Sequence, residues 1–222
     1  MDACVCKCQS MVWERESFQG ATMILESAEY LGIIAFSASG FYIGKRNQLD
    51  VLGIYITAFL TALGGGIMRD IIIDRPPISF TQNLPVLIVV LITTLLLFLR
   101  HRYHHDIDSK PLFVFIDAVG MASFAISGAL LALENGYNLQ GIAIIAFVTA
   151  IGGGIFRDIL INQVPYVLKG GFYGVIAIGV GSVVYILDIL SILNTLSLFI
   201  LFFITVILRM VAYYRKWHLP TI

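Results

Sequence analysis

Two ten-residue stretches of this chain place an arginine beside an aspartate shortly after three glycines. The first is TALGGGIMRD at residues 61–70, and the second is TAIGGGIFRD at residues 149–158. Both end long hydrophobic runs, where a charged side chain costs at least about 2.5 kcal/mol unless it meets a partner or water. Charged pairs at such a depth are typical of polar pathways through a membrane. The chemistry that these residues favour is therefore the permeation of ions or small solutes.

The glycines predict a weak point in each helix, because each glycine costs about 1 kcal/mol relative to alanine. A helix that bends, thins or restarts there exposes its backbone to an ion or to another helix. A restarted helix also presents free N–H groups, which favour an aspartate in its first turn. The candidate pathway residues are Gly64, Gly65, Gly66, Arg69 and Asp70 in the first stretch and Gly152, Gly153, Gly154, Arg157 and Asp158 in the second.

Other polar residues in the hydrophobic runs can line the same pathway. Glu29 and Asp117 occupy equivalent acidic positions, and hydroxyl groups can replace part of a cation's hydration shell. With both arginines and all four carboxylates facing one lumen, the net charge is minus two, which favours cations. Hydroxyls can instead bond to their own helix. The hydroxyl candidates are Ser37, Ser39, Ser123, Ser127, Thr61 and Thr149.

A structural role is the main alternative for the doubled stretch. In that interpretation the glycines only permit tight helix packing, and each arginine and aspartate forms an internal brace or an anchor at the membrane interface. A mixed role, in which the charges brace the weak point and also line the path, is a third interpretation.

The elements that must position these residues are transmembrane helices. Of 222 residues, 59% are hydrophobic and only 13% are charged, and the mean hydropathy is +0.90. A soluble domain has about 25% charged residues. The formal net charge of zero gives no sign of nucleic-acid binding. No enzyme site, cofactor site or fixed metal site is predicted, although K⁺ or Na⁺ could bind transiently.

Seven hydrophobic runs approach the roughly 20 residues that cross a bilayer. They predict an all-α integral membrane protein with seven transmembrane helices. Counted over alternating spans, three Lys or Arg residues lie on the side of the N-terminus and nine on the other. The positive-inside rule then places the N-terminus outside and the C-terminus in the cytoplasm, as in a bacterial inner (plasma) membrane. The runs are residues 29–44, 50–73, 79–99, 112–133, 139–161, 170–187 and 189–208.

The chain contains an internal repeat. An offset of 88 residues aligns residues 29–77 with 117–165, and 21 of these 49 pairs are identical. Because each copy contains three crossings, the second copy must enter the membrane from the opposite side, which predicts two inverted three-helix repeats. The predicted parts are an N-terminal tail (1–28), repeat 1 (29–105), repeat 2 (112–188), a seventh helix (189–212) and a cytoplasmic tail (213–222).

Two further groups of residues carry weaker signals. Cys4, Cys6 and Cys8 fit neither a zinc site nor a disulfide framework, so we interpret residues 1–28 as a free tail, with metal or redox binding as the alternative. The histidines of RHRYHHD are interpreted as interface residues, with a metal site as the alternative.

The doubled GGG-I-x-R-D-I motif, in two three-helix repeats followed by a seventh helix, resembles the prokaryotic TRIC family of trimeric intracellular cation channels. The same domain is also known as a glycine transporter. The resemblance covers about residues 25–212. It implies a homotrimer in a lipid membrane, with a pore in each protomer that is kinked at the glycines and passes K⁺ and Na⁺. It also implies that the glycines, arginines and aspartates of the two motifs are pore residues.

Three functions remain open from the sequence. The first is a passive monovalent cation channel, favoured by the charged residues around a narrow centre. The second is an alternating-access carrier for a small solute such as glycine, in which helix N-termini bind the carboxylate. The third is a structural or partner-binding membrane protein. Unitary current steps would favour the channel, and saturable uptake would favour the carrier.

Overall fold

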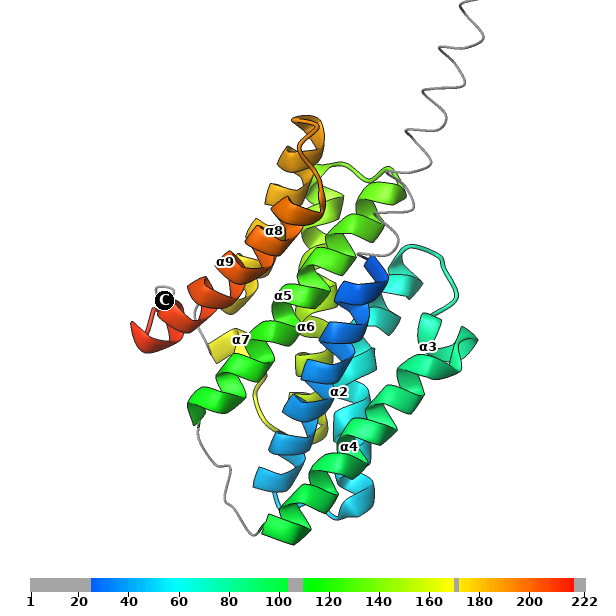
Figure 1. Ribbon diagram of the computed structural model, residues 1–222, viewed down its shortest axis with the longest axis vertical. Coiled ribbons are helices and arrows are strands. Elements are labelled where there is room, and N and C mark those ends of the chain that lie inside the picture. The colour runs from blue at the N-terminus through cyan, green and yellow to red at the C-terminus, as the bar shows by residue number, and fades with distance from the viewer. Residues whose placement is uncertain (1–24, 104–109, 170–171, 218–222) are drawn as a thin grey trace, which may run out of the picture.

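The computed structural model describes residues 25–103, 110–169 and 172–217, and the regular secondary structure within these ranges is helical (Figure 1). The predicted cysteine tail and part of the histidine segment lie outside the described residues. The helices are residues 25–46, α2 (Val51–Ile72), α3 (Ile78–Thr81), α4 (Asn83–Tyr103), α5 (Lys110–Glu134), α6 (Leu139–Leu160), α7 (Tyr166–Lys169), α8 (Tyr173–Ile189) and α9 (Thr195–Tyr214).

The long helices form a bundle whose core is mainly apolar but also encloses a set of polar and charged side chains. Helix α6 packs against α2, α5 and α8, while α4 lies at one flank and α8 and α9 at the other (Figure 1). The outer faces carry exposed apolar side chains, such as Phe98 on α4 at 61% exposure and Phe199 on α9 at 58%. Such faces suit contact with lipid tails.

Four of the described helices are long and apolar enough to cross a membrane by length and composition: α2, α5, α6 and α9. Shorter apolar segments occur at Asn83–Leu99 and Tyr173–Ile189. The regular structure of the described residues is thus helical and suited to a membrane, and the total of seven spans stays a prediction.

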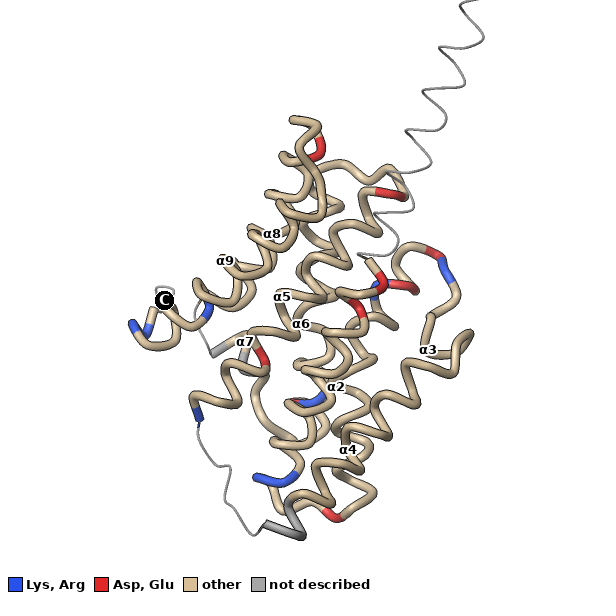
Figure 2. The backbone as a smooth tube through the Cα atoms, viewed as in Figure 1, with Lys and Arg blue, Asp and Glu red and all other residues tan. Residues whose placement is uncertain are grey.

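Charged residues are unevenly distributed along the bundle. Figure 2 shows that Lys and Arg lie mostly in the lower half of the view, where α5 begins, and that Asp and Glu lie mostly in the upper half. The positive-inside rule expects the end that is rich in Lys and Arg to face the cytoplasm, as in the predicted orientation. The orientation itself stays a prediction.

The 88-residue offset found in the sequence also relates the local structures. The bounds of α2 and α6 differ by 88 residues, and so do those of α3 and α7. The N-caps match as well: the side chains of Asp50 and Asn138 accept hydrogen bonds from the N–H groups of Gly53 and Gly141, at 2.7 and 2.9 Å. The two copies thus fold alike over these helices.

Of the alternatives considered for the glycine triplets, a break followed by a restarted helix does not occur. Helices α2 and α6 run unbroken through their triplets to Ile72 and Leu160. The glycines instead lie where the two helices touch. A side chain at Gly65 would overlap the backbone carbonyl of Thr149, and one at Gly153 would overlap that of Thr61. Close contact between the two helices therefore accounts for a glycine at these positions.

This continuity changes the place of the two aspartates. Asp70 and Asp158 lie near the C-terminal ends of α2 and α6, not in a first turn. The helix dipole is unfavourable for a carboxylate there and favourable for the neighbouring arginine. The aspartates must therefore be held by specific partners.

Helix α9 begins six residues later than the predicted start at residue 189 and extends to Tyr214. Asn194 fixes the start: its side chain accepts a hydrogen bond from the N–H of Ser197 at 2.9 Å, and the Ser197 hydroxyl accepts one from the N–H of Asn194 at 2.9 Å. Arg209 directly follows the predicted hydrophobic run 189–208 and was counted with the charges on the C-terminal side of the membrane, but it lies inside α9 and is only 2% exposed.

Candidate functional site: two buried charged clusters

The first cluster surrounds Arg69, which is fully buried. Its guanidinium donates to Glu29 Oε1 at 2.8 Å, to Asp70 Oδ1 at 2.9 Å and to Ser127 Oγ at 3.3 Å. The other oxygen of Asp70 accepts the N–H of Ile78 at 3.1 Å, which ties α2 to α3. We call Arg69, Asp70, Glu29 and Ser127 the Arg69 cluster.

The second cluster surrounds Arg157, which is 3% exposed. Its guanidinium donates to Asp158 Oδ1 at 2.9 Å, to Ser39 Oγ at 2.9 Å and to Asp117 Oδ1 at 3.4 Å. Ser39 in turn donates to Asp117 Oδ1 at 3.1 Å. We call Arg157, Asp158, Asp117 and Ser39 the Arg157 cluster.

Each residue of one cluster has its equivalent, 88 positions away in the sequence, in the other cluster. Each arginine pairs with two carboxylates from its own repeat and with one hydroxyl from the opposite repeat. The two repeats therefore complete each other's clusters. This explains why residues separated by more than 100 positions, such as Arg157 and Ser39, meet at one site.

The hydrogen bonds also give the order of the clusters along two helices. In the helix 25–46, Glu29 reaches the Arg69 cluster and Ser39 reaches the Arg157 cluster. In α5 the order is reversed, because Asp117 joins the Arg157 cluster and Ser127 joins the Arg69 cluster. Ten residues of helix separate each pair of positions, which corresponds to about 15 Å along the helix axis.

Two phenylalanines lie between these positions. Phe36 and Phe124 are related by the same offset, and their ring centroids are 5.2 Å apart. Both side chains are buried, at 0% and 1% exposure. Together with the contact between Gly65 and Thr149, they fill the centre between the clusters with apolar side chains and backbone. The sequence showed the identity of the two phenylalanines but gave no sign that they touch.

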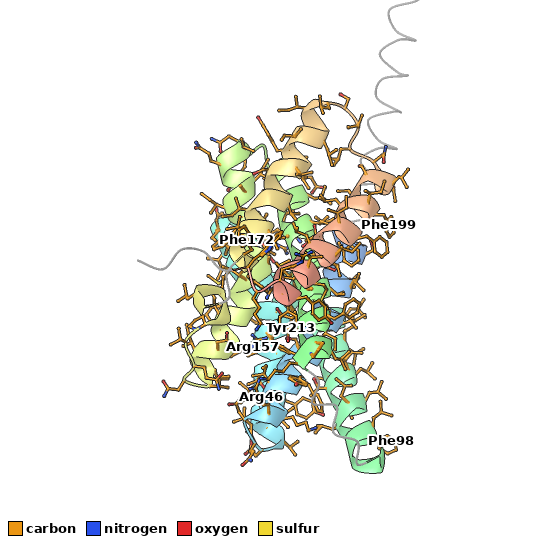
Figure 3. The ribbon with its side chains drawn as sticks, turned by 90° about the vertical axis from the view of Figure 1, so that its left-hand side faces the viewer. Arg46, Phe98, Arg157, Phe172, Phe199 and Tyr213 are labelled. Atoms are coloured by element: carbon orange, nitrogen blue, oxygen red, sulfur yellow. The ribbon has the colours of Figure 1, made fainter. Side chains whose placement is uncertain are left out.

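Cavities reach the two clusters to different extents. A cavity of about 500 Å³ borders Arg157 and Asp158, and Figure 3 shows Arg46, Arg157 and Tyr213 on this side of the bundle. At Glu29 and Asp70 the cavity is only about 10 Å³, which is room for about one water molecule. The two sites are thus alike in their charged residues but not in the space beside them.

Solved TRIC structures share this fold. One TRIC cation channel is 35% identical to this chain with a TM-score of 0.78, covering 89% of this chain and 96% of the other. A prokaryotic TRIC channel crystallised in 0.5 M KCl is 32% identical with a TM-score of 0.80, covering 89% and 100%. A family model described as "Glycine transporter" matches residues 26–102 and 114–188.

The chain belongs to the TRIC family. A further relative is the UPF0126 membrane protein YvgT of Bacillus subtilis (strain 168), which is 36% identical over 200 residues, covering 89% of this chain and 96% of the relative. These relatives are channels or membrane proteins by name.

The hydroxyl candidates in this TRIC protein divide into two groups. Ser39 and Ser127 join the clusters, as described above. Ser37, Thr61 and Thr149 donate to carbonyls one turn earlier in their own helices, at 2.6 Å each, which is the bonding that the alternative interpretation expected. The buried Ser123 hydroxyl has no hydrogen-bond partner among the described residues. In this conformation, cluster membership distinguishes Ser39 and Ser127 from the other candidates.

Sequence reasoning missed two buried residues beside the Arg157 cluster. Tyr173 on α8 is only 4% exposed, and its side chain interacts electrostatically with Asp117. The guanidinium carbon of Arg209 on α9 lies 4.7 Å from the centroid of the Tyr173 ring. Tyr173 lies beyond the aligned part of the repeat, where the equivalent residue is Pro85. The sequence offered one indication of this contact, which is that Arg209 directly follows the last hydrophobic run, residues 189–208.

Metal-binding side chains do not gather elsewhere in the part of the chain that the structure describes. No three His, Cys, Asp or Glu residues within it are placed to hold a metal ion together. In the two charged clusters the carboxylates are paired with arginine.

Proposed function

We propose that this TRIC protein is a channel for the monovalent cations K⁺ and Na⁺. The observation that carries the proposal is the pair of buried Arg–carboxylate clusters on either side of an apolar centre. Buried ionisable groups in a membrane bundle are typical of ion pathways. Similarity to solved TRIC cation channels adds independent support.

The proposed pore runs within one protomer and connects the two clusters through the centre. It uses the candidate pathway residues of both motifs, with Phe36 and Phe124 as the constriction. Because these rings are buried and the cavity at Asp70 is about 10 Å³, we assign this conformation to a closed channel. In our proposal the pore opens when α2 and α6 kink and separate at the two glycine triplets.

Inverted repeats are part of the proposal. The reversed order of the clusters along the helix 25–46 and along α5 is what two oppositely inserted copies would produce. We retain seven spans in the bacterial inner membrane, with the N-terminus outside and the C-terminus in the cytoplasm. The cavity beside Arg157 then faces the cytoplasm.

We also propose a homotrimer, in which part of the exposed apolar surface contacts lipid and part contacts the other subunits.

Current through purified protein in a planar bilayer tests the function. In a KCl gradient we expect discrete current steps that reverse near the K⁺ equilibrium potential. Reversal near the Cl⁻ potential would contradict cation selectivity. A silent bilayer combined with saturable glycine uptake into vesicles would favour the carrier, which otherwise rests on the family description "Glycine transporter" alone.

Neutralising Asp158 should reduce cation selectivity. This residue borders the large cavity, so Asp158→Asn removes a negative charge from the mouth of the proposed pore. At a point about 10 Å from one unit charge, the local cation concentration changes about twofold if the dielectric constant is that of bulk water. The change is larger in a protein, because the effective dielectric constant is lower there. Reversal potentials in a KCl gradient measure the effect. The matched control is Asp188→Asn on the exposed end of α8, and an equal shift in both variants would contradict a local role for Asp158.

A further inference from the structure

Arg209 is the one buried charge near the clusters that comes from α9, outside the two repeats. Its guanidinium lies over the buried ring of Tyr173, and the Tyr173 side chain interacts electrostatically with Asp117 of the Arg157 cluster. Four residues further along α9, on the same helix face, Tyr213 borders the 500 Å³ cavity. Helix α9 thus adds a positive charge beside one end of the proposed pore.

This addition makes the two ends electrically unequal. The Arg69 cluster has one arginine and two carboxylates, so its formal charge is minus one. The Arg157 cluster has the same balance, and further positive charges lie at that end: Arg209 over Tyr173, and Arg46 and Lys110 in the lining of the cavity. The position equivalent to Tyr173 in the first repeat is Pro85, which cannot offer a ring and hydroxyl to an arginine in the same way.

We propose that Arg209 is a selectivity-determining residue that makes conduction asymmetric. Its charge opposes cation entry at the Arg157 end and leaves the Arg69 end unaffected, so the channel rectifies. Cations entering from the side of the C-terminus carry less current than cations entering from the other side. The inference rests on the proposed channel function.

A purely structural role for Arg209 predicts a different outcome. An arginine that only anchors α9 to α8 would affect assembly when it is replaced, but it would leave the ratio of inward to outward current unchanged. The ratio therefore separates the two roles, because it compares two directions of flow through the same open channel.

The test is single-channel recording in symmetric KCl at equal positive and negative voltages, with a C-terminal epitope tag reporting the orientation. In Arg209→Gln we expect current from the C-terminal side to rise about two- to fifteenfold, the range for one charge at about 10 Å with effective dielectric constants between 80 and 20. The current ratio should move towards one. Arg209→Lys should keep the wild-type ratio, and Arg215→Gln on the exposed end of the same helix is the matched control.

Each result has a definite meaning. A silent wild type contradicts the proposed function. A conducting wild type whose current ratio is unchanged in an assembled Arg209→Gln variant overturns the role of Arg209 alone, and so does an equal change in Arg209→Gln and Arg209→Lys. If Arg209→Gln does not fold, Thr205→Asp keeps the arginine and adds a compensating carboxylate one turn away on α9. This variant should also move the ratio towards one, and an unchanged ratio overturns the inference.

Discussion

Gly65→Ala should destabilise the protein by about 3 kcal/mol, and its ion flux should fall as the amount of folded protein falls. An added Cβ would overlap the Thr149 carbonyl, which belongs to the backbone of α6 and cannot rotate away. The two helices would have to separate, and overpacked cores lose about 1–3 kcal/mol, with backbone collisions at the upper end. Thermal unfolding in detergent measures the stability, and K⁺ flux into vesicles measures the function.

The adjacent glycine provides the matched control. A Cβ at Gly66 has its nearest neighbour at 3.8 Å, which is an ordinary contact, so Gly66→Ala should keep the helix-propensity gain of about 1 kcal/mol. In the second repeat, Gly153→Ala should behave like Gly65→Ala, and Gly154→Ala should behave like Gly66→Ala. Equal stability of Gly65→Ala and Gly66→Ala would show that flexibility, and not close contact, selects glycine at residue 65.

The glycine triplets show how far the sequence could lead. Their duplication correctly drew attention to α2 and α6. However, a run of glycines has two physical meanings, a weak helix or a close helix contact, and only the position of the partner helix decides between them. Because that partner is the equivalent segment of the other repeat, the deciding contact joins residues 65 and 149, which no local pattern can reveal.

The arginines show a similar division. The need for acidic partners followed from the cost of a buried charge, and the internal repeat identified Glu29 and Asp117 as equivalent. Each cluster contains a serine from the opposite repeat, Ser127 with Arg69 and Ser39 with Arg157. This pairing could not be predicted without knowing how the two copies pack. Arg209 was counted with the charges on the C-terminal side of the membrane because the hydrophobic run ends at residue 208, whereas α9 continues to Tyr214 and keeps Arg209 inside the bundle.

Arg69→Met should be the most damaging change in the first cluster. It leaves the carboxylates of Glu29 and Asp70 buried together without their cation, and loss of one partner from a buried ion pair costs about 3–5 kcal/mol. We expect a large fall in the yield of folded protein and a free energy of unfolding lower by about this amount. Denaturant or thermal unfolding in detergent provides the measurement.

A second variant shows whether charge is the cause. Glu29→Gln in the Arg69→Met background restores the cluster's formal charge of minus one, so it should recover part of the lost stability. Glu29→Gln alone, which leaves Arg69 with Asp70, should cost less than Arg69→Met. The double-mutant cycle then gives a coupling free energy between the two residues. A coupling near zero would mean that water, and not Glu29, balances the arginine, so the Arg69 end would be hydrated even though the adjoining cavity measures only about 10 Å³.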